Sequence, residues 1–482
     1  MKYRSIQRNA IINIIQQVLL GLFPILTLQY AARVLGKVVY GRINFGISII
    51  DYFILFASLG ISTYAVREGA SLKNDKEGFS AFVNELFTVR LLLSVLSFSL
   101  LLAVMLLAKP LESYRLLLLL QGMMIPLGVL NMDWVFLSHE DYLTPSLCVL
   151  SAQTLSLVLL FLFVKGPGDE LRYAAVYVLA HCGSAVPSYF LAKRGTPVRL
   201  TVRPHLRKHL PPMFVLFSNS LMISIYVNSD ITLLGFLASA QEVGVYSVAV
   251  KIYTICKRLK GAAISVLMPR MSRYLHEGES AGYQQLLESS FRVLLLLIPP
   301  MSAGLYGVST DMILLFGGAQ FLDGVLPLRI LSIALLFASA ADYFSTTVLI
   351  PSHREKLVFR FTAISAFVNV GLNFFFIPAW GMAGAAVTTL IAEFLIAGLN
   401  FLHVRKLYLI PVRWPDAVDA ILGSIMIVIL CRIMDGFSLS LWVRLFGKVC
   451  VCVIFYMLLL LISKNDLILQ LVKRFCSRSQ HR

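Results

Sequence analysis

The chain has 482 residues, of which 58% are hydrophobic and only 14% are charged, and its mean hydropathy is +0.80. Soluble globular proteins are about half apolar and about a quarter charged, so this composition excludes a water-soluble protein. Lysine and arginine number 42 against 25 acidic residues, which gives a formal net charge of +17. In a membrane protein, an excess of basic residues usually reflects which loops lie in the cytoplasm and does not indicate binding of nucleic acid. We therefore expect no nucleic-acid partner.

Apolar runs long enough to cross a bilayer recur along the whole chain. A spanning helix needs about 20 predominantly apolar residues. Runs bounded by charges or turn residues predict fourteen spans, at 10–31, 43–66, 82–108, 114–138, 143–164, 172–192, 213–237, 244–268, 289–309, 325–350, 357–378, 382–404, 417–434 and 439–462. These runs are too long and too continuous for barrel strands. The expected fold class is therefore an all-α integral membrane protein with about 14 transmembrane helices.

Basic residues predict how these spans are oriented. With the N-terminus inside, the cytoplasmic segments hold 25 basic residues and the external segments hold 9. Cytoplasmic loops of membrane proteins carry the excess of lysine and arginine, so both termini are expected in the cytoplasm.

A basic loop divides the chain into two blocks of equal length. It covers 193–212 and carries six cations and no acid: Lys193, Arg194, Arg199, Arg203, Arg207 and Lys208. We expect an N-terminal six-helix bundle at 1–192, this cytoplasmic linker, a C-terminal six-helix bundle at 213–404, and two additional helices with a basic tail at 405–482. Two parallel bundles around a central cavity are the geometry of an alternating-access transporter.

Several stretches resemble the polysaccharide-transporter branch of the multidrug/oligosaccharidyl-lipid/polysaccharide exporter superfamily, the O-antigen-type flippases. They are AARVLGK at 31–37 with YGRINF at 40–45, LGISTYAVRE at 59–68, DWVF at 133–136, and NSDITLLG at 228–235 with VGVYSVA at 243–249. The resemblance runs from residue 5 to about 405. It implies a MATE-like fold and movement of undecaprenyl-pyrophosphate-linked oligosaccharide from the inner to the outer leaflet of a bacterial plasma membrane. It also implies a monomer among membrane lipids, in contact with polysaccharide polymerase and chain-length proteins.

Ionisable residues inside the spans are candidates for function, since each costs roughly 2.5–3.5 kcal/mol at a helix centre. Lys251 and Arg258 are seven residues apart and so share one face of span 8. Cations suit a diphosphate, because their attraction to phosphate grows as water is removed. The candidate substrate-binding residues are Arg33, Arg67, Arg90, Lys251, Arg258 and Lys260. The alternative for any one of them is a buried ion pair or a charge at a helix end.

A second group of polar residues lies in one depth band below the outer surface. It comprises Asp230 in span 7 and Asn369, Asn373, Thr389 and Glu393 in spans 11 and 12. One carboxylate with amide and hydroxyl oxygens suits a small hard cation, and the lipid II flippase of the superfamily resembles this pattern at a sodium site. Here Asn373 replaces the second acid of that pattern, so Asp230, Asn369, Asn373 and Thr389 are candidates for sodium, with a proton as the alternative coupling ion. The asparagines could instead form hydrogen bonds between helices.

Three further carboxylates lie inside predicted spans, at Asp51, Asp133 and Asp342. They could pair with cations such as Arg90 or take up protons. The sequence has no Walker-A, HExxH or GxSxG motif and no metal-spaced cysteine set, so we expect neither an enzyme nor a resident cofactor. A lipid II flippase and a MATE-type cation-coupled drug exporter remain the alternative functions.

Overall fold

The computed structural model describes residues 6–201, 205–265, 268–408, 410, 412–467 and 469; within 6–22, 259–265 and 268–269 it describes the backbone alone. Those residues form helices and no strands. Among the described residues, eleven segments are long and apolar enough to cross a membrane, and two of them, Phe23–Leu72 and Glu355–Val404, are 50 residues long. Each of the two contains a break, so each can supply two spans. With α11 (Ala240–Ser265), these helices are compatible with the expected fourteen and confirm an all-α membrane protein.

The chain forms two compact units, Met1–Gly244 and Val245–Arg482. The boundary lies within α11, whereas the sequence analysis divided the chain at the loop 193–212. The difference arises because α10 (Leu206–Leu237) packs along α1 (Ile6–Ser58) in the first unit. The two six-helix bundles remain a prediction.

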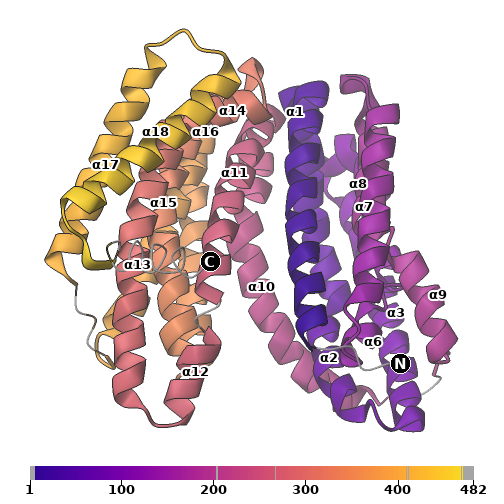
Figure 1. Ribbon diagram of the computed structural model, residues 1–482. Coiled ribbons are helices and arrows are strands. Elements are labelled where there is room, and N and C mark those ends of the chain that lie inside the picture. Colours follow the sequence, from indigo (N-terminus) through magenta and orange to yellow (C-terminus); the bar gives the residue numbers. More distant parts are fainter. Residues whose placement is uncertain are drawn as a thin grey trace. The chain divides into compact units, whose positions relative to one another are not determined.

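The first unit is built around α1, which contacts α3, α7 and α10. Figure 1 shows these helices in indigo to magenta. The other elements of the unit are α2 (Ile61–Leu72), α3 (Lys76–Leu107), η1 (Lys109–Tyr114), α4 (Arg115–Gly122), α5 (Met124–Gly128), α6 (Asp133–Ser138), α7 (Leu143–Phe163), η2 (Pro167–Asp169), α8 (Glu170–Cys182) and α9 (Ala185–Gly195).

Two of the predicted continuous spans are broken in this unit. The span at 114–138 consists of α4, α5 and α6, and the span at 172–192 consists of α8 and α9. Proline has no backbone N–H, so Pro126 cannot bond to the carbonyl of Gly122 and Pro187 cannot bond to that of Gly183. Each segment is still long and apolar enough to be one candidate span, Lys109–Ser138 and Pro167–Gly195, so both expected spans are present with a break inside each.

The second unit is built around two pairs of long helices. α15 (Val325–Phe344) packs against α16 (Glu355–Val404), and α13 (Ser280–Gly307) packs against α17 (Trp414–Asp435). The remaining elements are α12 (Met268–His276), α14 (Ser309–Phe316), η3 (Ala319–Gly324), η4 (Ser345–Leu349) and α18 (Leu441–Ile462).

Both breaks in the longest helices occur at a glycine with positive φ. Gly36 in α1 has φ 74° and Gly381 in α16 has φ 55°. Residues with a Cβ avoid this region, whereas glycine enters it freely. Each glycine therefore ends one span and starts the next without an intervening loop.

Two other glycines let α1 and the start of α11 approach closely within the first unit. A Cβ at Gly41 would lie 1.7 Å from the carbonyl oxygen of Ala240, and a Cβ at Gly244 would lie 1.9 Å from that of Lys37. No side chain fits at such distances, so these positions require glycine.

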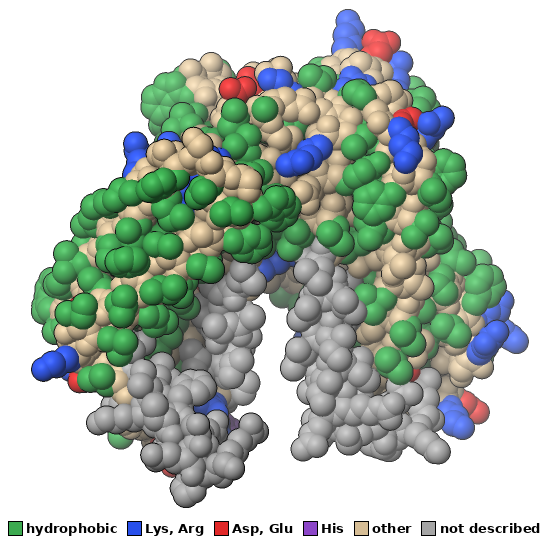
Figure 2. All heavy atoms as spheres, turned by 45° about the horizontal axis from the view of Figure 1, so that its top comes forward, with side chains coloured by type: hydrophobic (Ala, Val, Ile, Leu, Met, Phe, Trp, Pro, Cys, Tyr) green, Lys and Arg blue, Asp and Glu red, His purple; other side chains and the backbone are tan. Residues whose placement is uncertain are grey.

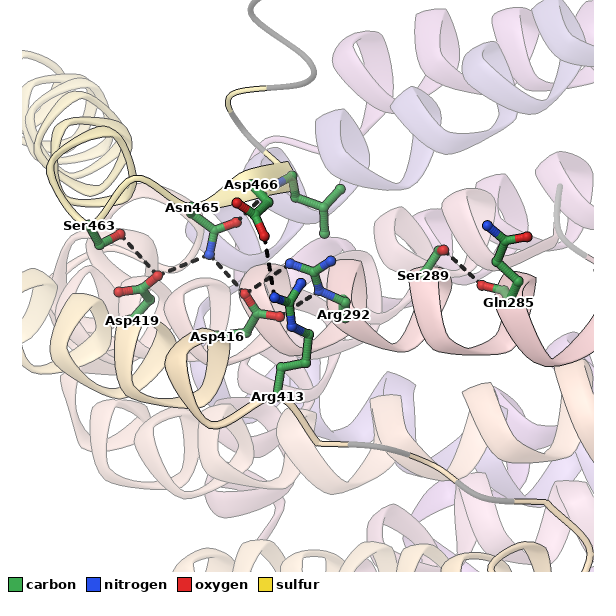
Figure 3. Close-up of polar contacts among 10 residues, drawn as sticks. Gln285, Ser289, Arg292, Arg413, Asp416, Asp419, Ser463, Asn465 and Asp466 are labelled. Atoms are coloured by element: carbon green, nitrogen blue, oxygen red, sulfur yellow. Dashed lines mark hydrogen bonds and ion pairs between the residues drawn. The ribbon is translucent and has the colours of Figure 1, made fainter.

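The two C-terminal helices are joined to the second unit by buried ionic contacts. Arg292 of α13 donates from Nε to Asp416 of α17 over 2.6 Å, and Asn465 donates to both Asp416 and Asp419 over 2.9 and 3.0 Å (Figure 3). Near the other end, Asp311 accepts from Arg444 and from Lys448, whose side chain is fully buried. Spans 13 and 14 are therefore integral parts of this unit.

Large apolar side chains are exposed along many helices, as the green surface in Figure 2 shows. On α18 they include Trp442, Val443, Phe446, Val449 and Val453. A soluble protein rarely exposes so continuous an apolar face, and a helix that borders lipid does.

Candidate functional site

The candidate residues of the second unit centre on a buried carboxylate, Glu393 of α16. Its side chain is 4% exposed. Oε1 accepts from Lys257 Nζ over 2.9 Å and from the Tyr253 hydroxyl over 3.0 Å, both on α11. A buried carboxylate in low dielectric needs such a partner, and Lys257 neutralises it. Glu393 is thus an ion-paired group, and its role in ion coupling stays a prediction.

A hydrogen-bonded polar cluster joins the two arms of α16 on either side of Gly381. Asn373 donates to Asn369 Oδ1 over 3.3 Å and accepts from the Thr388 hydroxyl over 2.5 Å. All three side chains are buried. Thr389 donates to the carbonyl of Ala385 over 3.0 Å. The structure therefore brings Asn369 and Asn373 together as expected, and it adds Thr388, which the sequence analysis did not select.

Asp230 belongs to the first unit, whereas Asn369, Asn373, Thr389 and Glu393 belong to the second. Asp230 is buried in α10 among polar neighbours. Two residues before it, Asn228 lies 3.5 Å from Asp51 of α1, and two residues after it, Thr232 donates to Ser48 over 2.9 Å. α1 and α10 are therefore joined by polar side chains at this depth, as interhelical hydrogen bonds in membranes predict.

The residues present in the second unit fit a hard cation only in part. Amide and hydroxyl oxygens of Asn369, Asn373 and Thr388 suit sodium by chemistry, but they already bond to one another. The carboxylate on the same arm of α16, Glu393, is paired with Lys257. Among the described residues no group of three or more His, Cys, Asp or Glu could hold a metal ion. A sodium ion there would replace hydrogen bonds that the structure contains.

The cationic candidates of the first unit differ in exposure. Arg33 on α1 and Arg67 on α2 are both exposed, and Arg67 lies 3.2 Å from Glu68. Arg90 of α3 donates to the carbonyl of Asn131 over 2.6 Å, at the break between α5 and α6. The Arg90 guanidinium thus satisfies a backbone carbonyl at the break between α5 and α6.

Asp133 completes this polar group at the start of α6. It accepts from Ser188 over 2.7 Å and from Asn131 over 3.2 Å. Within the described part of the chain no ion pair joins Asp133 to Arg90, although Asn131 contacts both. The expected pairing of Arg90 with an intramembrane acid is therefore indirect, through Asn131.

The cations of α11 separate onto two faces of the helix. Tyr246, Tyr253 and Lys257 contact α16, through Thr389 and Glu393. The spacing of an α-helix places Lys251 and Arg258 together on another face, roughly 120–140° around the helix axis from the first. Arg258 is exposed and makes no ion pair with any described residue.

Two of the remaining candidates are placed less completely. Lys260 is in α11, but its side chain lies outside the described residues. Asp342 of α15 is partly buried and lies close enough to Lys257 to attract it. Sequence reasoning missed Thr388, Tyr253 and the pairing of Lys257 with Glu393. The helical repeat and the expected depth of a residue in the membrane do not show which partner a buried side chain contacts.

Comparison with known proteins places the chain in a sequence family. Residues 6–275 match the family described as "Polysaccharide biosynthesis protein". A protein of Escherichia coli K12 named "Putative O-antigen transporter" is 22% identical over 407 residues, which are 83% of this chain and 97% of that protein. The "Probable low-salt glycan biosynthesis flippase Agl15" of Haloferax volcanii is 25% identical over 160 residues, 33% of this chain and 34% of that protein.

Solved structures share the fold at low sequence identity. A lipid II flippase, MurJ, in an inward closed conformation aligns with a TM-score of 0.73 and 16% identity, over 96% of this chain and 100% of the other. An inward-facing multidrug resistance MATE family transporter of the MOP superfamily aligns with a TM-score of 0.61 and 17% identity, over 80% and 94%. The MATE-like fold expected from the resemblance is confirmed.

Proposed function

Because this chain belongs to the polysaccharide biosynthesis protein family, we propose that it is a flippase and not an enzyme. Its substrate would be an undecaprenyl-pyrophosphate-linked oligosaccharide, the repeat unit of an O-antigen, capsule or exopolysaccharide. The protein would move this lipid from the inner to the outer leaflet of a bacterial plasma membrane, with both termini in the cytoplasm. The similarity to an O-antigen transporter over most of both chains supports this substrate class.

The observation that carries the proposal is the pair of cations, Lys251 and Arg258, on the face of α11 away from α16. The structure accounts for Lys257, which neutralises Glu393, but gives Arg258 no such partner among the described residues. A cation kept inside a membrane helix without a protein counter-ion needs another anion or water. A lipid-linked diphosphate supplies that anion, and its affinity for the cations rises where water is excluded.

Alternating access is the proposed mechanism of transport. The two six-helix bundles would rock about a central cavity that opens to one leaflet at a time. The glycine breaks at Gly36 and Gly381 occur within long helices, where they allow a change of direction without a loop. The fold shared with a lipid II flippase and a MATE family transporter supports a mechanism of this class.

A cation gradient would drive the cycle, with sodium or a proton as the coupling ion. Asp230, Asn369, Asn373 and Thr389 remain the candidates for the ion. The hydrogen bonds among Asn369, Asn373 and Thr388 weigh against sodium, because a sodium ion bound there would have to compete with them. Transport that responds to neither gradient would contradict this coupling.

We further propose that the protein acts as a monomer that meets polysaccharide polymerase and chain-length proteins in the membrane. A lipid II flippase is the second candidate, since such a protein shares the fold. A MATE-type drug exporter is less favoured, because binding of small organic cations would be opposed by Lys251 and Arg258.

Deletion of the gene tests the substrate class. The proposal expects a cell that grows but lacks its surface polysaccharide, with lipid-linked repeat units accumulating on the cytoplasmic side. Loss of viability with intact surface polysaccharide would favour lipid II instead. Unchanged polysaccharide together with greater sensitivity to cationic drugs would favour a drug exporter.

A further inference from the structure

A fully buried histidine, His209 in the first turns of α10, lies between a tyrosine and a glutamate. Its Nε2 is 2.7 Å from Glu85 Oε2 on α3, and its Nδ1 is 2.9 Å from the Tyr64 hydroxyl on α2. The imidazole packs against the rings of Tyr64 and Phe82, 5.7 and 5.8 Å between centroids. Three helices therefore meet at one titratable ring, which has no part in the site described above.

This arrangement accommodates both protonation states of His209. In the neutral ring, Nε2–H donates to Glu85 and Nδ1 accepts from the Tyr64 hydroxyl. In the charged ring both nitrogens donate, and Tyr64 can accept because a hydroxyl is both donor and acceptor. Proton uptake thus needs only a rotation of one O–H bond, and it converts the hydrogen bond between a neutral ring and the Glu85 carboxylate into an ion pair.

A route to water is provided by the neighbouring histidine. His205 Nδ1 lies 2.7 Å from the other oxygen of Glu85, and the His205 side chain is 77% exposed. Among the described residues, Arg67 and Glu68 of α2 also act on Tyr64 and lie 3.2 Å apart, and the cations Arg207 and Lys208 directly precede His209 on α10. Glu85 is the carboxylate that bonds to the His209 ring.

The first turn of α10 depends on these side-chain contacts more than most helix starts do. Pro211 and Pro212 follow it, and they cannot donate to the carbonyls of Arg207 and Lys208. The linker before α10 also contacts α3. The backbone N–H groups of Arg199 and Thr201 donate to the side chains of Asn84 and Thr88. Side chains of α2 and α3 thus hold the point where the linker enters the membrane unit.

We propose that Tyr64, His209 and Glu85 form a proton-binding site, in which protonation of His209 tightens the attachment of α10 to α2 and α3. The ligand is a proton, which arrives from the aqueous side that His205 faces. This inference does not depend on the identity of the transported substrate. Binding of the proton and attachment of α10 are linked, so each must strengthen the other.

Nitrogen NMR of histidine-labelled full-length protein in lipid vesicles tests the site directly. As the pH is lowered across the range in which the protein stays folded, the His209 signal should pass from a neutral ring protonated on Nε2 to an imidazolium. Glu85→Gln removes the counter-charge and should move that transition to lower pH. A signal that keeps one state throughout, or a midpoint unaffected by Glu85→Gln, would overturn the proposal. The signal is identified by its loss in His209→Gln or, if that variant fails to fold, by its shift in Tyr64→Phe.

Hydrogen exchange tests the mechanical consequence. After correction for the intrinsic effect of pH, amides at 206–210 should exchange several-fold more slowly when His209 is protonated. His209→Gln should remove this dependence, whereas the matched change of an exposed histidine, His276→Gln, should leave it intact. Equal pH dependence in His209→Gln, or none in the unmodified protein, would show a purely structural histidine.

Discussion

At the scale of single residues, the cations of α11 fall into two kinds. Lys257 has a buried carboxylate partner, so its cost in the membrane is offset within the protein. Lys251 and Arg258 lie on another face, where the proposed diphosphate would meet them. The two kinds therefore respond differently to substitution.

Reversal of either cation on the substrate face should abolish transport without unfolding the protein. Lys251→Glu or Arg258→Glu replaces a charge-assisted contact worth about 1.5–3 kcal/mol with repulsion, so export should fall at least about tenfold. The measurement is surface polysaccharide in a complemented deletion strain, normalised to the amount of protein in the membrane. Lys356→Glu, at an exposed cation near the start of α16, is the matched control and should export normally. Normal export by a reversed variant would exclude that residue from the substrate site.

Removal of one partner of the Lys257–Glu393 pair should instead destabilise the fold. Lys257→Met leaves a buried carboxylate unpaired, and breaking a buried pair costs roughly 3–5 kcal/mol. Glu393→Gln in the same chain removes that charge and should restore most of the lost stability. Thermal unfolding of the two single variants and the double variant measures the coupling. If the effects of the single substitutions simply add, the pair is not formed in the membrane.

Sequence reasoning could identify which residues were unusual here but not which of them meet. Their positions inside predicted spans showed that the charges of Glu393 and Lys257 carry a free-energy cost in the membrane. The repeat of the α-helix placed Lys251 and Arg258 on one face. The partners of Glu393 come from α11, about 140 positions away in the chain. Thr388 was passed over for Thr389 because a helix repeat does not say which of two adjacent threonines faces Asn373 across the bend at Gly381.

At the scale of helices, direction changes depend on glycine and proline. Gly36 and Gly381 join successive spans directly, and Pro126 and Pro187 accompany breaks within two others. The runs of apolar residues predicted the lengths of these segments well, because a bilayer sets that length. The same runs could not predict whether each helix is continuous, because the residues before and after a break are equally hydrophobic.

The close contact of α1 with the start of α11 should be intolerant of any side chain. Gly41→Ala would place a Cβ 1.7 Å from the carbonyl oxygen of Ala240, so the helices must separate, at a cost of about 1–3 kcal/mol or more. The melting temperature of the purified protein should fall. Gly371→Ala in α16 is the control, because its Cβ meets nothing within 4 Å and should leave the melting temperature unchanged or raised. Equal effects of the two substitutions would contradict the close contact.

The ionic contacts of α17 with α13 should hold the C-terminal helices in place. Asp416→Asn keeps the shape of the side chain but leaves Arg292, whose side chain is only 14% exposed, without its counter-charge, which costs roughly 3 kcal/mol. Limited proteolysis of the loop before α17 should accelerate in this variant. Asp466→Asn, at an exposed pair with Arg413, should leave the rate unchanged.

At the scale of the whole molecule, the excess of positive charge separates into a topological part and a functional part. Most basic residues lie in segments that the orientation rule assigns to the cytoplasm. Inside the described helices, Lys257 and Lys448 pair with acids, Arg90 bonds to the carbonyl of Asn131, and Lys251 and Arg258 lie on the proposed substrate face. Composition predicted the membrane class, and the similarity to polysaccharide transporters supplied a substrate that composition could not.

Transport in a purified system tests the central proposal most directly. Vesicles would contain the protein and an undecaprenyl-pyrophosphate oligosaccharide, and an added glycosidase would measure the share of glycan on the outer leaflet after a gradient is imposed. We predict that this share rises with the unmodified protein and with Lys356→Glu, but not with Lys251→Glu or in protein-free vesicles. A share that stays at the protein-free level with the unmodified, folded protein would contradict the proposed function.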